Sequence, residues 1–211
     1  MKYSALALTT LLLLCTSTQA QTSFPNDGKI IDGVYYNKFF NFAFTYPKDW
    51  IVPDEATNER IRDRANEEAT RKGNLAAMKD AYLLLTVSRH PLGTPNIAVN
   101  PGVLMAAEKV AHLPGATAKE YLLGLRSIKQ REGAQATLNE PVEFRIAGFQ
   151  FFRDDFSREV RGVTMKQSVF VLIKKGYALV INFIADDQKL LEEMTESMRT
   201  ILPVGRGGNK P

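Results

Sequence analysis

Two consecutive apolar runs, residues 164–174 and 177–185, constrain the fold more than any other part of the chain. In the first run, Phe170 and Leu172 alternate with Val169, Val171 and Ile173, so apolar side chains point to both faces of a strand. The second run has the same double pattern. A strand that is apolar on both faces has to be covered on both faces. The sequence therefore predicts an α+β fold in which helices flank an antiparallel sheet above and below.

Short glycine-containing links indicate how these strands pair. Strands are expected at about 138–146, 149–160, 164–174 and 177–185, joined through Ala147-Gly148, Arg161-Gly162 and Lys175-Gly176. Links of this length typically join neighbouring antiparallel strands, so the four runs are expected to form a meander. Earlier in the chain, strands are expected at residues 34–37, 42–46 and 82–88. Residues 103–110 permit a helix or a strand, and a strand is favoured because Pro101-Gly102 precedes them and Pro114-Gly115 follows.

A charged helix is predicted from about Glu55 to Lys72, with Asp54 as its cap and Gly73 as its stop. Its apolar stripe is thin and consists of Ile61, Ala65 and Ala69. We therefore expect this helix to lie on the surface.

Two further helices have stronger signals. Thr117 and Glu120 have the spacing of a capping box, and the helix that follows has apolar residues at three- and four-residue intervals up to Ile128, with Gly133 as its end. The last helix is predicted over residues 188–202, capped by Asp186 and Asp187 and stopped by Pro203. Its apolar face comprises Leu190, Leu191, Met194, Met198, Ile201 and Leu202.

The first twenty residues have the pattern of a secretory signal peptide. Lys2 precedes an apolar stretch from Ala5 to Leu14, and Thr18-Gln19-Ala20 resembles a cleavage site. The apolar stretch is shorter than the roughly 20 residues that span a bilayer. The sequence predicts a periplasmic or secreted protein, cleaved near Ala20 and without a transmembrane segment.

Cys15 is the single cysteine and follows Leu14, where a lipoprotein signal would have a small residue. This argues against lipidation without settling it. If Cys15 leaves with the signal peptide, disulfides and cysteine-ligated metals are excluded.

The rest of the chain is predicted to be one domain. Residues 21–33 are polar and turn-rich and indicate a leader, residues 34–203 the domain, and residues 204–211 a disordered tail. Removing Lys2 from 27 basic residues leaves 26 against 23 acidic ones, a net charge of +3. Because the two signs are interleaved, the sequence gives no indication of nucleic-acid binding.

The opening of this domain resembles PsbP-like domains. Tyr36-Asn37, followed by residues 39–50 (FFNFAFTYPKDW), resembles their aromatic hairpin ending in Tyr-Pro, polar residues and Trp. The resemblance extends over most of residues 34–202 and implies the antiparallel α/β/α sandwich shared by PsbP-like and Mog-like proteins, here in an exported bacterial member. It implies non-catalytic binding or assembly, and it transfers no functional residue.

The ionisable residues do not form a recognisable catalytic or metal site. His90 and His112 both lie at predicted strand boundaries, without a second ligand at a suitable spacing. Asp154 and Asp155 are neighbours on a predicted strand, so they should point to opposite faces, with Arg153 and Arg158 available as partners. We expect no catalytic, cofactor-binding or metal-binding residue, no cofactor and no enzyme activity.

The aromatic residues of the opening hairpin allow two interpretations. Trp50 with Tyr35, Tyr36, Phe39, Phe40, Phe42 and Phe44 could form a sugar- or lipid-binding platform. Core packing is favoured, because aromatic side chains dominate protein cores.

Three functions remain open at this level. The favoured one is a binding or assembly module of the cell envelope with an unknown protein partner, whose contacts would lie on residues 55–72 or 92–102. The alternative is a carrier of a small apolar ligand held between sheet and helix. An unfamiliar enzyme would have to use Asp154, Asp155, His90 and Arg158.

Overall fold

The computed structural model describes residues 24–71, 81–111, 113 and 115–204. The predicted signal peptide, the first residues of the leader, Gly73, His112 and nearly all of the tail lie outside the described residues. Among the described residues, no helix is long and apolar enough to span a bilayer.

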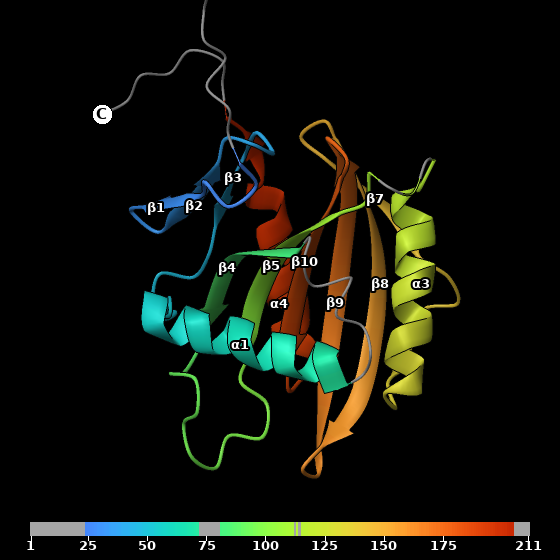
Figure 1. Ribbon diagram of the computed structural model, residues 1–211. Coiled ribbons are helices and arrows are strands. Elements are labelled where there is room, and N and C mark those ends of the chain that lie inside the picture. Colours follow the sequence, from blue (N-terminus) through green and yellow to red (C-terminus); the bar gives the residue numbers. More distant parts are fainter. Residues whose placement is uncertain (1–23, 72–80, 112, 114, 205–211) are drawn as a thin grey trace, which may run out of the picture.

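The described residues form two antiparallel sheets and three α-helices (Figure 1). The large sheet has the order β4-β5-β10-β9-β8-β6, with β7 also paired to β8. Its strands are β4 (Ala81–Ser88), β5 (Gly102–Lys109), β6 (Gln135–Ala136), β7 (Val142–Ile146), β8 (Phe149–Val160), β9 (Val163–Lys174) and β10 (Tyr177–Ala185). The expected α+β class is confirmed.

The meander β7-β8-β9-β10 is confirmed, and its turns explain it. Ala147, Arg161 and Lys175 have φ between 48° and 52°, and the glycine after each also has a positive φ. Two consecutive residues with positive φ are typical of the type I′ turn, whose twist matches that of a hairpin. The prediction was wrong at one boundary, because β7 begins at Val142 rather than near residue 138, directly after Pro141. Proline has no N–H to donate to a ladder.

The large sheet has a hydrophobic core on each face, as its doubly apolar strands require. On one face Phe170, Leu179 and Phe183 pack with Leu191 and Met198 of the C-terminal helical segment. That segment consists of α4 (Gln188–Glu196) and the 3-10 turn η1 (Ser197–Thr200). The opposite core is smaller. There Val169, Val171 and Ala178 pack against Ala118 and Leu122 of α3 (Ala118–Arg131).

The capping box of α3 is present as predicted. The Glu120 N–H donates to Thr117 Oγ1 at 3.2 Å, and the Thr117 N–H donates to Glu120 Oε2 at 2.9 Å. Ile128, expected on the packed face, is instead 40% exposed. Near the end of α3 the side chain that faces the sheet is Lys129, whose ammonium lies 5.2 Å from the centre of the Phe156 ring.

The charged helix α1 (Glu55–Arg71) crosses in front of the large sheet in Figure 1. Asp54 caps it as predicted, since its Oδ1 accepts the Thr57 N–H at 2.9 Å. Every side chain of α1 whose burial is described is exposed or half-exposed. The expectation of a surface helix is confirmed for these residues.

A second, smaller sheet was not anticipated. Its order is β1-β2-β3-β11, with β1 (Lys29–Ile31), β2 (Val34–Asn37), β3 (Phe42–Thr45) and β11 (Leu202–Pro203). β1 falls inside the segment predicted to be a leader. Tyr35, Phe42 and Phe44 from this sheet join the core beside α4.

The prediction of one helix through residue 202 was wrong. α4 ends at Glu196, η1 follows, and Ile201 is extended, with φ −64° and ψ 118°. Thr200 Oγ1 accepts the Thr45 N–H at 3.0 Å and donates to Thr45 O at 3.3 Å, which aligns the chain with β3. Leu202 therefore lies in a strand and is 59% exposed instead of buried.

Candidate functional site

A groove of about 460 Å³ opens between the β3–α1 connection, the end of β4 and α4. Trp50, Leu190 and Met194 contribute its apolar part, while Asp49, Arg89 and Lys189 are among its charged lining residues. We call it the Trp50 groove. Trp50 is half-buried: its ring packs against the core and also lines this groove.

Local backbone contacts hold this groove in place. The Trp50 N–H donates to Pro47 O at 3.1 Å, which closes a turn directly after β3. Ile51 and Ser88 then exchange backbone hydrogen bonds of 2.8 and 3.0 Å, so the connection is fastened to the end of β4.

Arg89 follows directly after β4, and its N–H donates to Pro101 O at 2.8 Å. Trp50 and Arg89 are distant in sequence and meet because Ile51 and Ser88 pair. The backbone positions of Trp50 and Arg89 are therefore fixed by the fold.

The charged side chains around the groove fall into two groups. Asp187 caps α4 by accepting the Leu190 N–H at 2.8 Å, and Lys189 lies 3.7 Å from Glu193 across one helical turn. Arg89 and Asp49 differ, because within the described part of the chain neither side chain has a hydrogen-bond or ion-pair partner. Among the described residues, an unpaired cation and an unpaired anion thus border an aromatic and aliphatic surface.

The lining of this groove has residue types that are common at protein interfaces. Tryptophan, methionine and arginine are enriched at protein interfaces, and tryptophan and arginine are enriched among the residues that contribute most binding energy. Among the described residues, no group of three or more His, Cys, Asp or Glu side chains could hold a metal ion.

Asp154 and Asp155 point to opposite faces, as predicted for neighbours on a strand. Asp154 is fully buried towards α3, where Arg126 donates to it from Nε at 2.8 Å and from Nη2 at 2.7 Å. This hydrogen bond raises the pKa of Arg126 above its usual value. On the other face, Asp155 accepts two hydrogen bonds of 2.8 Å from Arg153 and one of 2.7 Å from Ser168. Both carboxylates are thus engaged in structural pairs.

Sequence reasoning missed Arg126 as the partner of Asp154. The two residues are 28 positions apart on a helix and a strand, and no local pattern relates them. Arg153 was expected to pair across strands, and it pairs instead with Asp155 two residues along the same strand.

The four residues that an enzyme would have to use are not brought together. His90 follows β4, whereas Asp154, Asp155 and Arg158 lie on β8, and three strands separate the two. With roughly 4.8 Å between neighbouring strands, β4 and β8 are about 19 Å apart. His90 makes its described contacts through its backbone, to Ser88 and Asn100. His112 lies outside the described residues.

A second hollow, of about 510 Å³, lies beside the end of α3 and the β8–β9 turn. Arg158, Glu132 and Gln135 are among its lining residues. Lys129 lies nearby and donates to Gln167 at 2.8 Å; burial lowers its pKa, and the charge of Arg158 adds to the effect. Both hollows are surface features bordered by charged groups. Neither is the apolar pocket between sheet and helix that a carrier would need.

The other aromatic residues of the opening hairpin divide between core and surface. Tyr35, Phe40, Phe42 and Phe44 are buried, which confirms core packing for them. Tyr36 and Phe39 are half-exposed. No sugar- or lipid-binding platform is formed by the group as a whole.

Comparison with known proteins places the chain near PsbP-like structures at a large distance in sequence. No family model matches it, and no curated protein matches it. The solution structure of cyanobacterial PsbP (CyanoP) from Synechocystis sp. PCC 6803 matches with 12% identity and a TM-score of 0.46, over 81% of this chain and 91% of that one. LpqN of Mycobacterium tuberculosis, described as involved in cell envelope biogenesis, matches with 16% identity and a TM-score of 0.42, over 77% of this chain and 83% of that one. The chain is similar to both of these structures along most of its length, at a large distance in sequence.

Proposed function

We propose that this chain is an exported, non-catalytic binding module of the bacterial cell envelope that holds a segment of a partner protein in the Trp50 groove. The observation that supports this most directly is the composition of the groove. A half-buried Trp50 and the side chain of Met194 lie beside Arg89 and Asp49, whose charges are unused within the described structure. A peptide can offer an apolar side chain and charges of both signs together, and so matches all of these groups.

Export is the second part of the proposal and rests on the sequence. The apolar stretch that ends near Leu14 and the small residues before Gln21 have the order of a cleavable signal peptide. Mature protein recovered from the periplasm or medium should begin at Gln21. If the protein were found in the cytoplasm with residues 1–20 still attached, export would be contradicted, while binding in the Trp50 groove would not be affected.

The groove is tested by site-specific photocrosslinking in intact cells. A photoreactive residue at Lys189, on the rim, should give adducts with one defined protein, and the same residue at the exposed Leu123 of α3 should not. Adding Arg89→Glu should remove the Lys189 adduct, because it reverses a charge that the partner contacts. Arg64→Glu, an exposed change on α1, is the matched control and should leave the adduct intact. Adducts that persist in the Arg89→Glu protein would exclude the groove as the binding site.

A further inference from the structure

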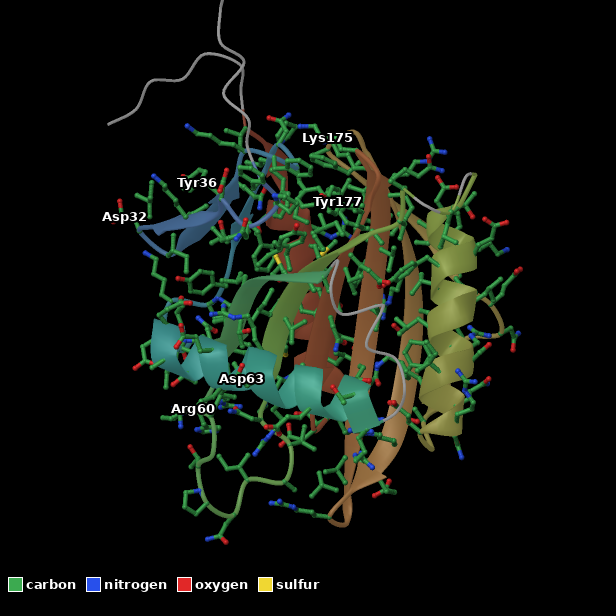
Figure 2. All side chains as sticks on the ribbon, viewed as in Figure 1. Asp32, Tyr36, Arg60, Asp63, Lys175 and Tyr177 are labelled. Atoms are coloured by element: carbon green, nitrogen blue, oxygen red, sulfur yellow. The ribbon has the colours of Figure 1, made fainter. Side chains whose placement is uncertain are left out.

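Four lysines gather at one end of the molecule, where the β2–β3 and β9–β10 turns meet; we call this surface the lysine end, and it comprises Lys38, Lys109, Lys174 and Lys175. Lys174 donates from Nζ to Phe40 O at 2.7 Å, which joins the two turns. Tyr177 on β10 pairs with Lys109 on β5 and with Lys174 on β9, so these residues form a row across three strands. Figure 2 shows Lys175 and Tyr177 together at this end.

The positive charge of the lysine end is not neutralised within the described structure. None of the four lysines forms an ion pair with a described acidic residue. Glu108, next to Lys109 in sequence, points to the opposite face and accepts a hydrogen bond from the Tyr121 hydroxyl. Burial and the neighbouring charge of Lys175 lower the pKa of Lys174. Because no described acidic residue neutralises these cations, their charge is available to an anionic partner.

Aromatic rings lie between these cations. The Lys175 ammonium is 4.7 Å from the centre of the Phe39 ring, and Phe39 meets Tyr177 edge to face with 5.3 Å between ring centres. Both rings are half-exposed. Amphipathic aromatic side chains beside lysines are typical of surfaces that lie at the boundary between lipid headgroups and acyl chains.

Two strongly exposed apolar side chains border the same turns. Leu202 is 59% exposed and pairs with Ala43 in the small sheet. Phe24 is 57% exposed and precedes Pro25, whose carbonyl accepts a hydrogen bond from Asn37 at 2.8 Å. A soluble polyanion would gain nothing from these apolar groups, whereas a bilayer offers them an apolar environment.

We propose that the lysine end docks on the surface of a bilayer containing anionic phospholipids. The cations occupy turns and strand ends, and none of them lines either of the two hollows described above. Their partner is therefore an extended surface rather than a small enclosed anion. Docking in this way goes beyond the proposed function, because it sets an orientation towards a membrane and does not involve the Trp50 groove.

The test measures binding of the purified, exported form of the protein to vesicles in a sedimentation assay. The wild type should bind vesicles containing phosphatidylglycerol and should not bind phosphatidylcholine vesicles. Binding should weaken between 50 and 300 mM salt, because exposed charges are screened. Replacing Lys38, Lys109 and Lys175 with Gln should weaken binding by at least about tenfold, given the attraction that each lysine has for an anionic surface. Equal binding by this triple variant would overturn the proposal.

The matched control removes the same charge at the opposite end, with Arg131, Arg158 and Arg161 replaced by Gln. These side chains are exposed, and Arg161 occupies the same turn position as Lys175, with φ 51° against 52°. The control should bind within about twofold of the wild type. If both triple variants lost vesicle binding equally, net charge alone would account for the binding, and a specific docking surface at the lysine end would be refuted.

A third variant separates a bilayer from a soluble polyanion. Leu202→Asn keeps every lysine and removes one exposed apolar group, so it should weaken vesicle binding several-fold. It should leave retention of the protein on a soluble polyphosphate unchanged. Vesicle binding that is insensitive to Leu202→Asn would contradict the bilayer and favour a soluble polyanion.

Discussion

Removing Arg126 should be among the most destabilising single changes in this protein. The side chain of Asp154 is 0% solvent-accessible, and its carboxylate accepts two charge-assisted hydrogen bonds from Arg126. Arg126 also donates to the carbonyls of Asn139, at 2.8 Å, and Leu138, at 3.2 Å. Arg126→Ala leaves a buried carboxylate without its cation, which costs about 3–5 kcal/mol. For a chain of this size, such a loss lowers Tm by roughly 6–20 °C.

Two companion variants show whether the buried charge is the cause. Replacing both partners, as Arg126→Met with Asp154→Leu, removes the charges together and should keep stability near that of the wild type. Lys119→Ala breaks the exposed pair with Glu140 and should change stability by less than about 1 kcal/mol.

Urea unfolding followed by circular dichroism measures all three variants. If Arg126→Ala cost less than about 1 kcal/mol, a compensating solvation of Asp154 would be implied and the reasoning refuted. A double variant as unstable as Arg126→Ala would mean that lost packing, and not the unpaired charge, causes the loss of stability.

Three other predictions concern Tyr35, the glycine that packs against it and a glycine in α3. Burial raises the pKa of Tyr35 from 10.0 to about 12. The stability that the neutral phenol contributes is therefore complete below pH 10 and is lost as the pH rises towards 12, by about 3 kcal/mol. Tyr35→Phe should reduce this alkaline loss of stability in urea titrations at pH 9 and 11.5, and an identical loss in both proteins would contradict the assignment. Gly28→Ala should destabilise by about 1–3 kcal/mol, because the added Cβ would clash with the Tyr35 hydroxyl oxygen and ring. Gly124→Ala, in a helix and with nothing within 4 Å of the added Cβ, should instead stabilise by about 0.5–1 kcal/mol in the same assay, and a loss there would show that the α3 backbone is constrained in an unrecognised way.

The meander and its double-sided burial could be predicted because their causes are local. Alternation at Val169–Ile173 follows from the strand period, and the turns at Ala147-Gly148, Arg161-Gly162 and Lys175-Gly176 need backbone conformations that glycine permits. The caps at Asp54 and Thr117 are equally local, since each acts within three residues. Such signals do not depend on the rest of the chain.

The Trp50 groove and the lysine end could not be predicted, because each joins segments that are distant in sequence. Trp50 reaches Arg89 only through the Ile51–Ser88 pair, and Lys174 reaches Phe40 across 134 residues. A lysine or tryptophan has the same local preferences whether its neighbours come from near or far in the chain. The sequence indicates which residues are polar, and the packing of the two sheets decides which of them meet.

The amino-acid sequence by itself determined the strand alternation, the turns, the helix caps and the need for helices on both faces of the large sheet, since these depend on backbone geometry and the burial of apolar side chains over a few residues. Tertiary structure alone decided the separate small sheet, the early end of α4 and the pairing of Asp154 with Arg126. In each of these the deciding contact is long-range: β11 with β3, Thr200 with Thr45, and a helix with a strand. Long-range contacts form only when the whole chain is compact, and no pattern of neighbouring residues specifies them.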